Sequence, residues 1–506
     1  MGNFVGIDLG TTFSAVATLD ETGRPTIVHN NEGQNITPSV VSFDRSQSTM
    51  LVGEEARRVL GTDPDTVGRF KRVMGEDKTY DLGGNELTPS DLSALVLKKL
   101  KQDAEAVIGP IEEAVVTIPA NFANEAREAT LAAAREAGLT VNHIINEPTA
   151  AALYYAFQQD GELSGTFAVY DMGGGTFDVS IIKVNGHDVE VVGTNGVSHL
   201  GGDDFDEALR GIVRRKCKEE TGREPEDEDY TKNDAEELKK SLGSRDSRSF
   251  RVNTSAGRAN FTVTREEFEE AISSLVAQAE MLCETTLDEV GLAPGSIDQV
   301  FLAGGSTRVP CVIESVRRVF GQEPVATANV DEVVALGACL YAAYKGKKEA
   351  LNPNQRATAE KMNVQEITSQ FYGTLSADTN RSRGSLEQFN FILIEKGQKI
   401  PCSKKESFYT IGEGQEFVNC QVTETKHKET DPQFVKTIWE GELELPEGRP
   451  AGQEIRVTFS YTANQTMQCA FVDVATGRRT EVDLNIGPGR EKKASREANI
   501  GDFLVE

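Results

Sequence analysis

Hydrophobic positions change their spacing along the chain, and these changes divide it into parts. As far as about residue 345, short apolar and β-branched runs alternate with stretches in which apolar residues recur every three or four positions. The runs "AVVTIPA", "TFAVYD", "DVSIIKV" and "QVFLAGG" are typical of buried strands, and the stretches between them are typical of amphipathic helices. This alternation predicts a layered α/β domain over residues 1–345.

The stretch from residue 88 to residue 109 predicts an amphipathic helix. Thr88 suits the N-cap, Pro89 the first helical position and Asp91 the third. The apolar positions that share one face are Leu92, Leu95, Val96, Leu100, Ala104, Val107 and Ile108. We therefore expect this helix to cover one face of a sheet.

After residue 345 the spacing of apolar and polar residues changes. Residues 346–368 are polar and poor in large apolar side chains, which predicts a linker between domains or a fraying last helix. Strict alternation follows, as in "EIRVTFSYTA" (residues 454–463), where every second residue is apolar. Several such strands separated by turn signals predict an antiparallel β-sandwich over residues 369–488. Residues 489–506 are mostly polar and are predicted to form a tail.

Charge and composition narrow the classes of function. The chain has 53 basic and 80 acidic residues, a net charge of −27, so nucleic acids and anionic membranes are not expected partners. No apolar run approaches the roughly 20 residues that span a bilayer, and no secretion signal is expected at the start. The 7 cysteines lie far apart, which predicts reduced thiols in a cytoplasmic protein. The 5 histidines lack metal-ligand spacing, so no structural zinc site is expected.

Two segments of the chain share one pattern of strand, aspartate, glycine turn and second strand. They are residues 4–17, "FVGIDLGTTFSAVA", and residues 168–182, "AVYDMGGGTFDVSII". The matching positions are Asp8 and Asp171, Gly10 and Gly173, and the dipeptides Thr12-Phe13 and Thr176-Phe177. The duplication predicts two similar lobes, about residues 1–163 and 164–345, that face each other across a cleft.

The residue types of these two turns suit phosphate binding. Glycines let backbone N–H groups approach phosphate oxygens, threonine hydroxyls add donors, and a carboxylate at each strand end can hold hydrated Mg²⁺. Each turn alone is also compatible with an ordinary glycine-rich hairpin, and the matched pair favours a phosphate clamp. Neither G-x-x-x-x-G-K-[ST] nor G-x-G-x-x-G occurs in the chain, so P-loop and Rossmann sites are not predicted.

A third glycine motif lies in "VFLAGGSTRVP", between a predicted strand and a predicted helix. Its residues Gly304, Gly305 and Ser306 offer bare backbone on which a planar base could lie, and Arg308 could stack against that base. Taken alone, the motif indicates a tight turn equally well. Together with the two phosphate turns it indicates the adenosine end of a nucleotide site.

Six motifs in this order resemble the seventy-kilodalton heat-shock protein (DnaK-type) chaperone family. They are "GIDLGTTFSAV", "VVTIPANF", "INEPTAAAL", "DMGGGTFDVS", "HLGGDDFD" and "LAGGSTRVP". The resemblance covers residues 1–345 closely and the β-domain loosely. It implies an ATPase domain of two actin-like lobes, a linker, and a β-sandwich that binds extended apolar peptides. The chain ends where the family's helical lid would begin, so bound peptide is expected to leave quickly.

The resemblance implies roles for individual residues at the phosphate end. The implied phosphate-binding residues are Gly10, Thr11, Thr12, Phe13, Gly173, Gly174, Gly175, Thr176, Gly201 and Gly202. Asp8, Asp171 and Asp178 would hold the waters of Mg²⁺ and orient the attacking water. Lys71 would stabilise charge on the transferred phosphoryl group, and Glu147 would complete the acidic set. Without the motif order, Lys71 would be interpreted as a surface lysine.

At the adenosine end the resemblance implies a second set of residues. They are Glu236, Lys239, Lys240, Gly243, Gly304, Gly305, Ser306, Arg308 and Asp331. The family usually has Arg where Lys240 stands and Ser where Gly243 stands. One stacking plane and one hydroxyl contact are therefore missing, and we expect weaker or less adenine-selective nucleotide binding.

Further positions correspond to those that couple the two domains and bind peptide in the family. Pro119, Arg127 and Glu366 match coupling positions, although a strand end and an ordinary helix arginine are simpler interpretations of the first two. The linker lacks most of the family's leucines, which puts coupling in doubt. Thr374, Phe408, Val418 and Cys420 match the peptide pocket and are equally compatible with a sandwich core.

The leading hypothesis is an ATP-dependent chaperone in which slow hydrolysis of Mg-ATP to ADP and phosphate gates peptide affinity. Its partners would be unfolded or nascent polypeptides, J-domain co-chaperones and nucleotide-exchange co-chaperones, in the cytoplasm. The alternative is a lidless, nucleotide-bound co-chaperone or scaffold with little peptide binding of its own. A sugar kinase or actin-like filament protein is a third possibility that "INEPTAAAL" and the β-domain disfavour.

Overall fold

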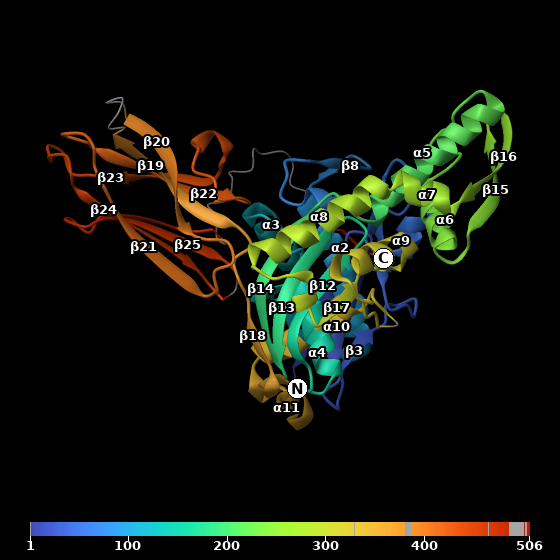
Figure 1. The fold of residues 1–506 in the computed structure, drawn as a ribbon, viewed down its shortest axis with the longest axis horizontal. Coiled ribbons are helices and arrows are strands. Elements are labelled where there is room, and N and C mark those ends of the chain that lie inside the picture. The colour runs from blue at the N-terminus through green and yellow to red at the C-terminus, as the bar shows by residue number, and fades with distance from the viewer. Residues whose placement is uncertain (1, 328, 380–385, 464, 485–499, 501–502) are drawn as a thin grey trace. The chain divides into compact units, whose positions relative to one another are not determined.

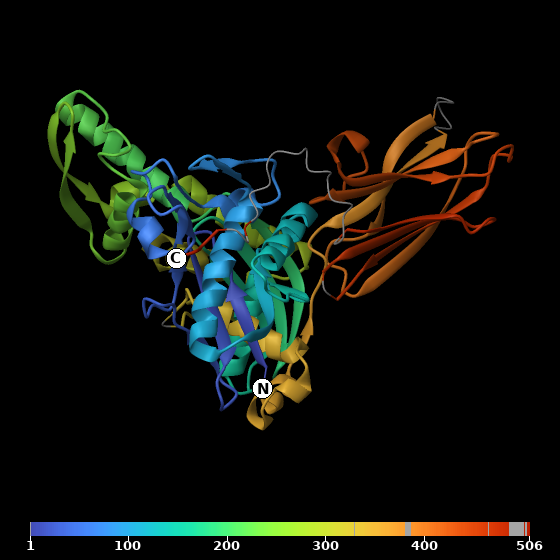
Figure 2. The same ribbon diagram turned by 180° about the vertical axis from the view of Figure 1, so that it is seen from behind.

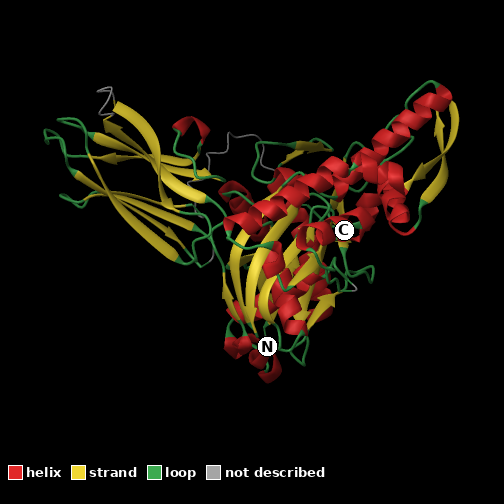
Figure 3. Ribbon diagram, in the orientation of Figure 1, coloured by secondary structure: helices red, strands yellow, loops and turns green. Residues whose placement is uncertain are grey.

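The chain divides into two compact units. The computed structural model describes residues 2–327, 329–379, 386–463, 465–484, 500 and 503–506 (Figure 1). The first unit comprises Met1–Phe122, Ala129–Val364 and Ala498–Glu506, and the second comprises residues 123–128 and 365–497. Helices and strands are mixed in the first unit, whereas strands dominate the second (Figure 3).

The first unit contains two large sheets that repeat one arrangement. In the six-stranded sheet the order is β11-β10-β1-β2-β3, with β4 paired to β2. Its strands are β1 (Asn3–Asp8), β2 (Phe13–Leu19), β3 (Pro25–Val28), β4 (Thr37–Pro38), β10 (Ile111–Ile118) and β11 (His143–Asn146). β1 runs antiparallel to β2 and parallel to β10, so the first glycine turn joins an antiparallel hairpin at the centre of the sheet.

The second large sheet is built around the second glycine turn. Its order is β17-β12-β13-β14-β18. The strands are β12 (Ser164–Met172), β13 (Phe177–Asn185), β14 (Asp188–Val197), β17 (Gln299–Ala303) and β18 (Asn363–Gln365). β12 runs antiparallel to β13 and parallel to β17, as β1 does with β2 and β10. The duplicated pattern in the sequence therefore corresponds to a duplicated pairing pattern in the sheets.

Two helices pack against each other between these sheets. Helix α10 (Val333–Lys345) contacts β1 and β2, and helix α4 (Glu147–Gln158) contacts β12 and β13. The close approach depends on glycine, because a Cβ atom at Gly337 of α10 would overlap the backbone carbonyl of Ala150 in α4. Gly6 in β1 plays the same part, since a Cβ atom there would overlap the backbone nitrogen of Cys339.

The predicted amphipathic helix is present as α2 (Pro89–Ile108). Thr88 and Asp91 form a capping box, and Leu92, Leu95, Val96, Leu100 and Ala104 are buried. The helix lies along one face of the strands of the first large sheet, as the view from behind shows (Figure 2). The prediction was wrong for the last turn, where Val107 is 62 % exposed, because the apolar face drifts away from the sheet near the end of the helix.

The other elements of the first unit surround these layers. The helices are α1 (Glu54–Arg58), α3 (Asn124–Glu136, of which the first residues belong to the second unit), α5 (Gly202–Thr221), α6 (Lys232–Ser244), α7 (Arg265–Ala271), α8 (Ser273–Glu289), α9 (Pro310–Phe320) and α11 (Pro353–Lys361). The 3₁₀ turns are η1 (Phe70–Val73), η2 (Pro294–Ser296), η3 (Gly305–Arg308) and η4 (Lys348–Ala350). Small sheets are formed by β5 (Val40–Asp44), β6 (Thr49–Val52) and β7 (Thr66–Gly68), by β8 (Tyr80–Leu82) and β9 (Asn85–Leu87), and by β15 (Ser247–Thr254) and β16 (Gly257–Thr264).

The second unit consists mainly of two four-stranded sheets that share one core. Their orders are β20-β19-β22-β23 and β21-β24-β25-β26. The strands are β19 (Phe371–Thr379), β20 (Leu386–Ile394), β21 (Cys402–Tyr409), β22 (Phe417–Thr425), β23 (Lys436–Glu444), β24 (Glu454–Tyr461), β25 (Met467–Asp473) and β26 (Arg479–Asp483), and η5 (Pro432–Phe434) is a 3₁₀ turn. Every second residue of β24 is buried, as its alternation predicts. The loop between β19 and β20 includes residues 380–385, outside the described residues.

Candidate functional site

Four carboxylates and one lysine meet where the two glycine hairpins of the first unit begin and end. Asp8 ends β1, and Asp171 near the end of β12 lies directly opposite Asp178 in β13. Asp171 and Asp178 are buried, and Asp8 is partly buried and accepts a hydrogen bond of 3.0 Å from the Thr117 hydroxyl. The duplicated aspartates therefore lie at equivalent strand ends of the two large sheets.

The lysine of this cluster is buried and paired. Lys71 lies in η1, and its Nζ is 2.6 Å from Oε1 of Glu147, the first residue of α4. Only 3 % of the Lys71 side chain is exposed. A buried ion pair of this kind is rarely a source of stability, because desolvation offsets much of the attraction between the charges. Because the pair lies beside three aspartates, it is a candidate for a functional site rather than a stabilising contact.

Burial raises the pKa values of the three aspartates, and the surplus of negative charge around them adds to the shifts. Burial raises the pKa of Asp8 to about 7, with Glu147 adding to the shift and Lys71 opposing it. Burial and Glu147 likewise raise the pKa of Asp178 to about 8. For Asp171, burial raises the pKa well above its usual value, and the surrounding carboxylates add to the shift. A cation placed among these groups would lower all three pKa values.

The two glycine turns contact each other. A Cβ atom at Gly174 would overlap the Thr12 hydroxyl, and a Cβ atom at Gly175 would lie 2.6 Å from the Cγ2 atom of Thr11. The Thr12 hydroxyl oxygen and Oδ2 of Asp178 are both buried without a hydrogen-bond partner among the described residues. Bare backbone, an unpartnered hydroxyl and an unpartnered carboxylate oxygen fit a phosphate group and a hydrated cation.

A hydrated cation is a candidate occupant of this cluster. Among the residues that the structure describes, no group of three or more His, Cys, Asp and Glu side chains could hold a metal ion. Mg²⁺ commonly keeps several of its waters when it binds beside carboxylates and phosphates. The carboxylates of Asp8 and Asp171 therefore fit the role of accepting hydrogen bonds from such waters.

The start of α5 completes the wall around the second glycine turn. The N–H groups of Gly202 and Asp203 donate to the carbonyls of Gly173 and Gly174, at 3.0 Å and 2.7 Å. The Ser306 hydroxyl also donates to the Gly173 carbonyl, at 2.7 Å. The structure thus brings Gly201 and Gly202, the triglycine turn and the third glycine motif together.

The residues predicted for the adenosine end form two ion-paired groups. Glu236 pairs with Lys240 at 2.8 Å and with Arg57 at 2.9 Å, and the Arg57 guanidinium lies 5.1 Å from the centroid of the Phe13 ring. In the other group, Arg308 pairs with Asp331 at 2.8 Å, and a Cβ atom at Gly305 would lie 2.5 Å from an Asp331 oxygen.

Lys239 and Gly243 take no part in these two groups. Lys239 donates to the Gly202 carbonyl at 2.8 Å and pairs with Asp206 at 2.8 Å. A Cβ atom at Gly243 would have no neighbour within 4 Å. Lys239 therefore contacts the start of α5, which packs against the second glycine turn. The space beside Gly243 is open.

Sequence reasoning missed three arginines, Arg57, Arg69 and Arg72, whose ion pairs join residues 1–163 to residues 164–345 of the first unit. Besides the Arg57–Glu236 pair, Arg69 is 2.6 Å from Asp203 and Arg72 is 2.8 Å from Asp204. Asp203 and Asp204 belong to the motif "HLGGDDFD" and could be singled out from the sequence. No local sequence pattern marks the arginines that pair with them. The cavity beside Thr12 and Glu236 measures only about 10 Å³, which is room for about one water molecule.

A comparison with protein families identifies the chain. A model of the Hsp70 protein family matches residues 4–500 of the 506 residues. The chain belongs to the Hsp70 family. Proteins of this family are ATP-binding chaperones of protein folding and the stress response, and they are ATPases that bind unfolded polypeptides and work with co-chaperones. The resemblance found in the six sequence motifs is thereby confirmed.

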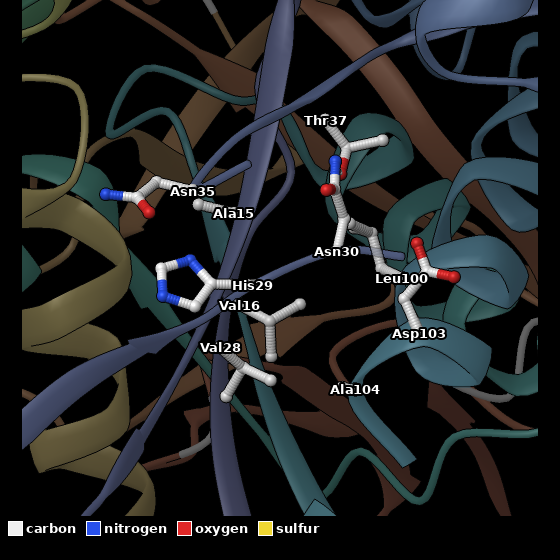
Figure 4. Close-up of a pocket in the computed structure, with 10 residues that line it drawn as sticks. All are labelled: Ala15, Val16, Val28, His29, Asn30, Asn35, Thr37, Leu100, Asp103 and Ala104. Atoms are coloured by element: carbon white, nitrogen blue, oxygen red, sulfur yellow. The ribbon is translucent and has the colours of Figure 1, made fainter. Parts of the chain in front are cut away.

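A second small pocket of this Hsp70 protein is lined by none of the predicted nucleotide-binding residues. It lies between the first large sheet and α2, with Asn30 and Thr37 on one side and Asp103 on the other (Figure 4). The Asn30 amide donates to the Thr37 hydroxyl at 3.2 Å, and Asp103 pairs with Lys99 at 3.2 Å. Its volume of about 10 Å³ suits one water molecule and no cofactor.

The four residues predicted for the peptide pocket of this Hsp70 protein line the core of the second unit. Thr374 and Cys420 are buried, and Phe408 and Val418 are partly buried against the same core. The Phe408 ring contacts Phe391, with 5.3 Å between ring centroids. These positions fit the interpretation as core residues, which the sequence had left open.

The residues predicted to couple the domains are all buried. Pro119 directly follows β10, and its carbonyl accepts from the Phe122 N–H at 3.2 Å. Within the second unit, the Arg127 guanidinium donates to the Ser369 hydroxyl at 3.0 Å, and the Glu366 carbonyl accepts from the Ile400 N–H at 3.0 Å. Their role in coupling stays a prediction.

The described helices include none that is both long and apolar enough to cross a bilayer.

Proposed function

We propose that this Hsp70 protein binds Mg-ATP between its two glycine turns and hydrolyses it slowly to ADP and phosphate. One observation carries the proposal: the buried Lys71–Glu147 pair lies among three aspartates whose pKa values are raised. Groups that titrate near neutral pH can accept a proton from an attacking water. The matching glycine turns supply a phosphate cradle on either side.

Each group of the cluster has a distinct part in this proposal. Lys71 would stabilise the negative charge that develops on the transferred phosphoryl group, and Glu147 holds that ammonium in place. Asp178, with its unpartnered oxygen, and Asp171 would orient the attacking water. Bound Mg²⁺ would neutralise charge on the phosphate oxygens, held through water by Asp8 and Asp171.

Three ion pairs join residues 1–163 to residues 164–345 beside the small cavity lined by Thr12 and Glu236. Nucleotide entry would involve these two halves of the first unit moving apart. Opening would break the pair between Arg57 and Glu236 and the pairs that Arg69 and Arg72 form with Asp203 and Asp204. We infer that these pairs close the halves over the nucleotide, with Glu236, Lys240 and Arg308 at the adenosine end.

We further propose that the second unit binds extended apolar peptide segments of unfolded or nascent polypeptides, with the nucleotide state gating affinity. An exposed apolar surface supports this: Tyr409, Ile411 and Phe417 are 61 %, 58 % and 51 % exposed. Gln415 ties part of this surface together, accepting from the Ile411 N–H and donating to the Phe417 carbonyl. J-domain and nucleotide-exchange co-chaperones, and a cytoplasmic location, are part of the same proposal.

ATP hydrolysis by purified variants tests the catalytic part. We expect Lys71→Met to lower single-turnover hydrolysis by about 100-fold or more, because it removes the cation that stabilises transition-state charge. Lys78→Met is the matched control, since Lys78 is an exposed lysine of the same segment. Circular dichroism and a thermal melt would check that both variants are folded. Hydrolysis by Lys71→Met at the rate of the control would contradict the proposal.

A further inference from the structure

The outer edge of a small sheet in the first unit carries an additional strand from the far end of the chain. The sheet has the order β6-β5-β7, so β6 is an edge strand with one row of backbone groups free for pairing. Three hydrogen bonds fill this row, involving Met50 and Val52 of β6. The Met50 N–H donates to the Leu504 carbonyl at 3.0 Å, the Glu506 N–H to the Met50 carbonyl at 3.1 Å, and the Val52 N–H to the Glu506 carbonyl at 3.0 Å.

Two further contacts hold this segment beside β6. Ile500 is only 4 % exposed, although most of residues 489–506 are polar in sequence. Lys98 of α2 donates to the carbonyl of Phe503 at 2.8 Å and to the carbonyl of Ile500 at 3.3 Å. Leu504, in contrast, is 71 % exposed. An apolar anchor, a cationic cap and a parallel backbone ladder are the elements of strand-addition recognition.

We propose that the edge of β6 is a docking site for a short extended segment, and that its occupant is Phe503–Glu506 of the same molecule, anchored by Ile500. Residues 498–506 belong to the first unit, whereas residues 365–497 belong to the second. The chain therefore leaves the first unit after residue 364 and returns to it at residue 498. An intramolecular segment competes well for such an edge, because its covalent connection to the same molecule raises its effective concentration there.

Docking also explains how this Hsp70 protein protects an edge strand that would otherwise pair with other chains. Exposed edges are common sites of aggregation, and natural proteins cover them. The proposal concerns the outer edge of β6 and does not depend on ATP hydrolysis.

Amide hydrogen exchange of the full chain, followed by mass spectrometry or NMR, tests the proposal. In the unchanged protein the amides of Met50 and Val52 should be protected. Ile500→Asp should speed their exchange by about tenfold or more, because it places a charge in a buried apolar site. Leu504→Asp makes the same change at an exposed position and should alter the exchange by less than about twofold.

A second pair of variants tests the backbone ladder without changing a buried side chain. Glu506→Pro removes the N–H that donates to Met50 and should speed exchange at Met50 and Val52, whereas Val505→Pro removes an N–H that lies outside the three ladder bonds. Two results would overturn the proposal: unprotected Met50 and Val52 amides in the unchanged protein, or protection of these amides in both Ile500→Asp and Glu506→Pro that equals the protection in the unchanged protein. Protection that rises with protein concentration would also overturn it, because the occupant would then be a second copy.

Discussion

At the scale of single residues, the site depends on charged side chains that are buried together. Burial matters because water screens their charges only weakly there. Lys71 and Glu147 are separated by 76 positions in the sequence and meet at 2.6 Å in a place that solvent hardly reaches. Burial and the neighbouring carboxylates disfavour the ionised forms of Asp8, Asp171 and Asp178. The cluster therefore favours either bound protons or a bound cation.

We expect the stability of the nucleotide-free protein to fall as pH rises from about 5 to about 9. The pKa values of Asp8 and Asp178, about 7 and about 8, lie above the ordinary value of 3.8, so the folded state binds more protons than the unfolded state between these limits. The stabilisation is complete below the ordinary pKa and is lost as pH rises through the raised values. Chemical denaturation at a series of pH values would measure this.

Asp178→Asn should flatten this pH dependence, and Asp188→Asn, at an exposed position, should leave it unchanged. For the same reason, Mg²⁺ should stabilise the protein more at pH 9 than at pH 6, since it binds the ionised carboxylates. A slope that Asp178→Asn does not alter would show that the titrating group lies elsewhere.

Several residues of the site were within reach of the sequence and others were not. The glycine turns and their aspartates repeat as a pattern, which is how Asp8 and Asp171 were found. Lys71 has no such pattern and was identified only from the family resemblance, because its burial depends on a distant partner. Arg57 and Arg69 were missed because their ion pairs join segments that lie far apart in the sequence.

At the scale of elements, the contact between α4 and α10 holds the two large sheets of the first unit together. We expect Gly337→Ala to destabilise the protein by about 1–3 kcal/mol, because the new Cβ atom would overlap the Ala150 carbonyl in a packed interior. Gly211→Ala is the matched control, since Gly211 lies in α5 with no neighbour within 4 Å of an added Cβ atom. That change should stabilise by about 0.5–1 kcal/mol.

The free energy of unfolding from urea titration would compare the two glycine variants. An equal effect of both changes would mean that α4 and α10 do not need their close approach.

Element boundaries were predicted well where a local signal exists. The capping residues Thr88 and Asp91 marked the start of α2, and the alternation of residues 454–463 marked β24. The polar stretch over residues 346–368, predicted as a linker or a fraying last helix, contains α11. Its capping box of Asn352 and Gln355 stabilises the helix despite a sequence poor in apolar residues. The polar composition left the helix as one of two interpretations, although its cap was visible in the sequence.

At the scale of the whole molecule, we expect ATP and ADP to give different peptide affinities, by about tenfold or more. A coupling free energy of 1–3 kcal/mol corresponds to this range. Fluorescence anisotropy of a labelled apolar peptide, measured with each nucleotide, would detect it. Equal affinity in the two states would contradict nucleotide gating and would favour a scaffold role.

The exposed apolar surface of the second unit should carry the peptide. Phe417→Ser should weaken peptide binding in both nucleotide states, whereas Phe434→Ser removes a phenylalanine that is 72 % exposed elsewhere in the same unit. The same anisotropy assay compares them. Equal loss in the two variants would indicate nonspecific adhesion to exposed aromatic side chains.

The return of Ala498–Glu506 to the first unit makes the second unit an insertion rather than an appendage. A protease that cuts once near residue 365 would leave fragments that still share the ladder between β6 and Phe503–Glu506. The fragments would then elute together from a sizing column although they separate in denaturing electrophoresis. A second cut, between the second unit and residue 498, would be needed to release the second unit. In a protein whose two domains simply follow one another, a single cut between them would be enough to separate them.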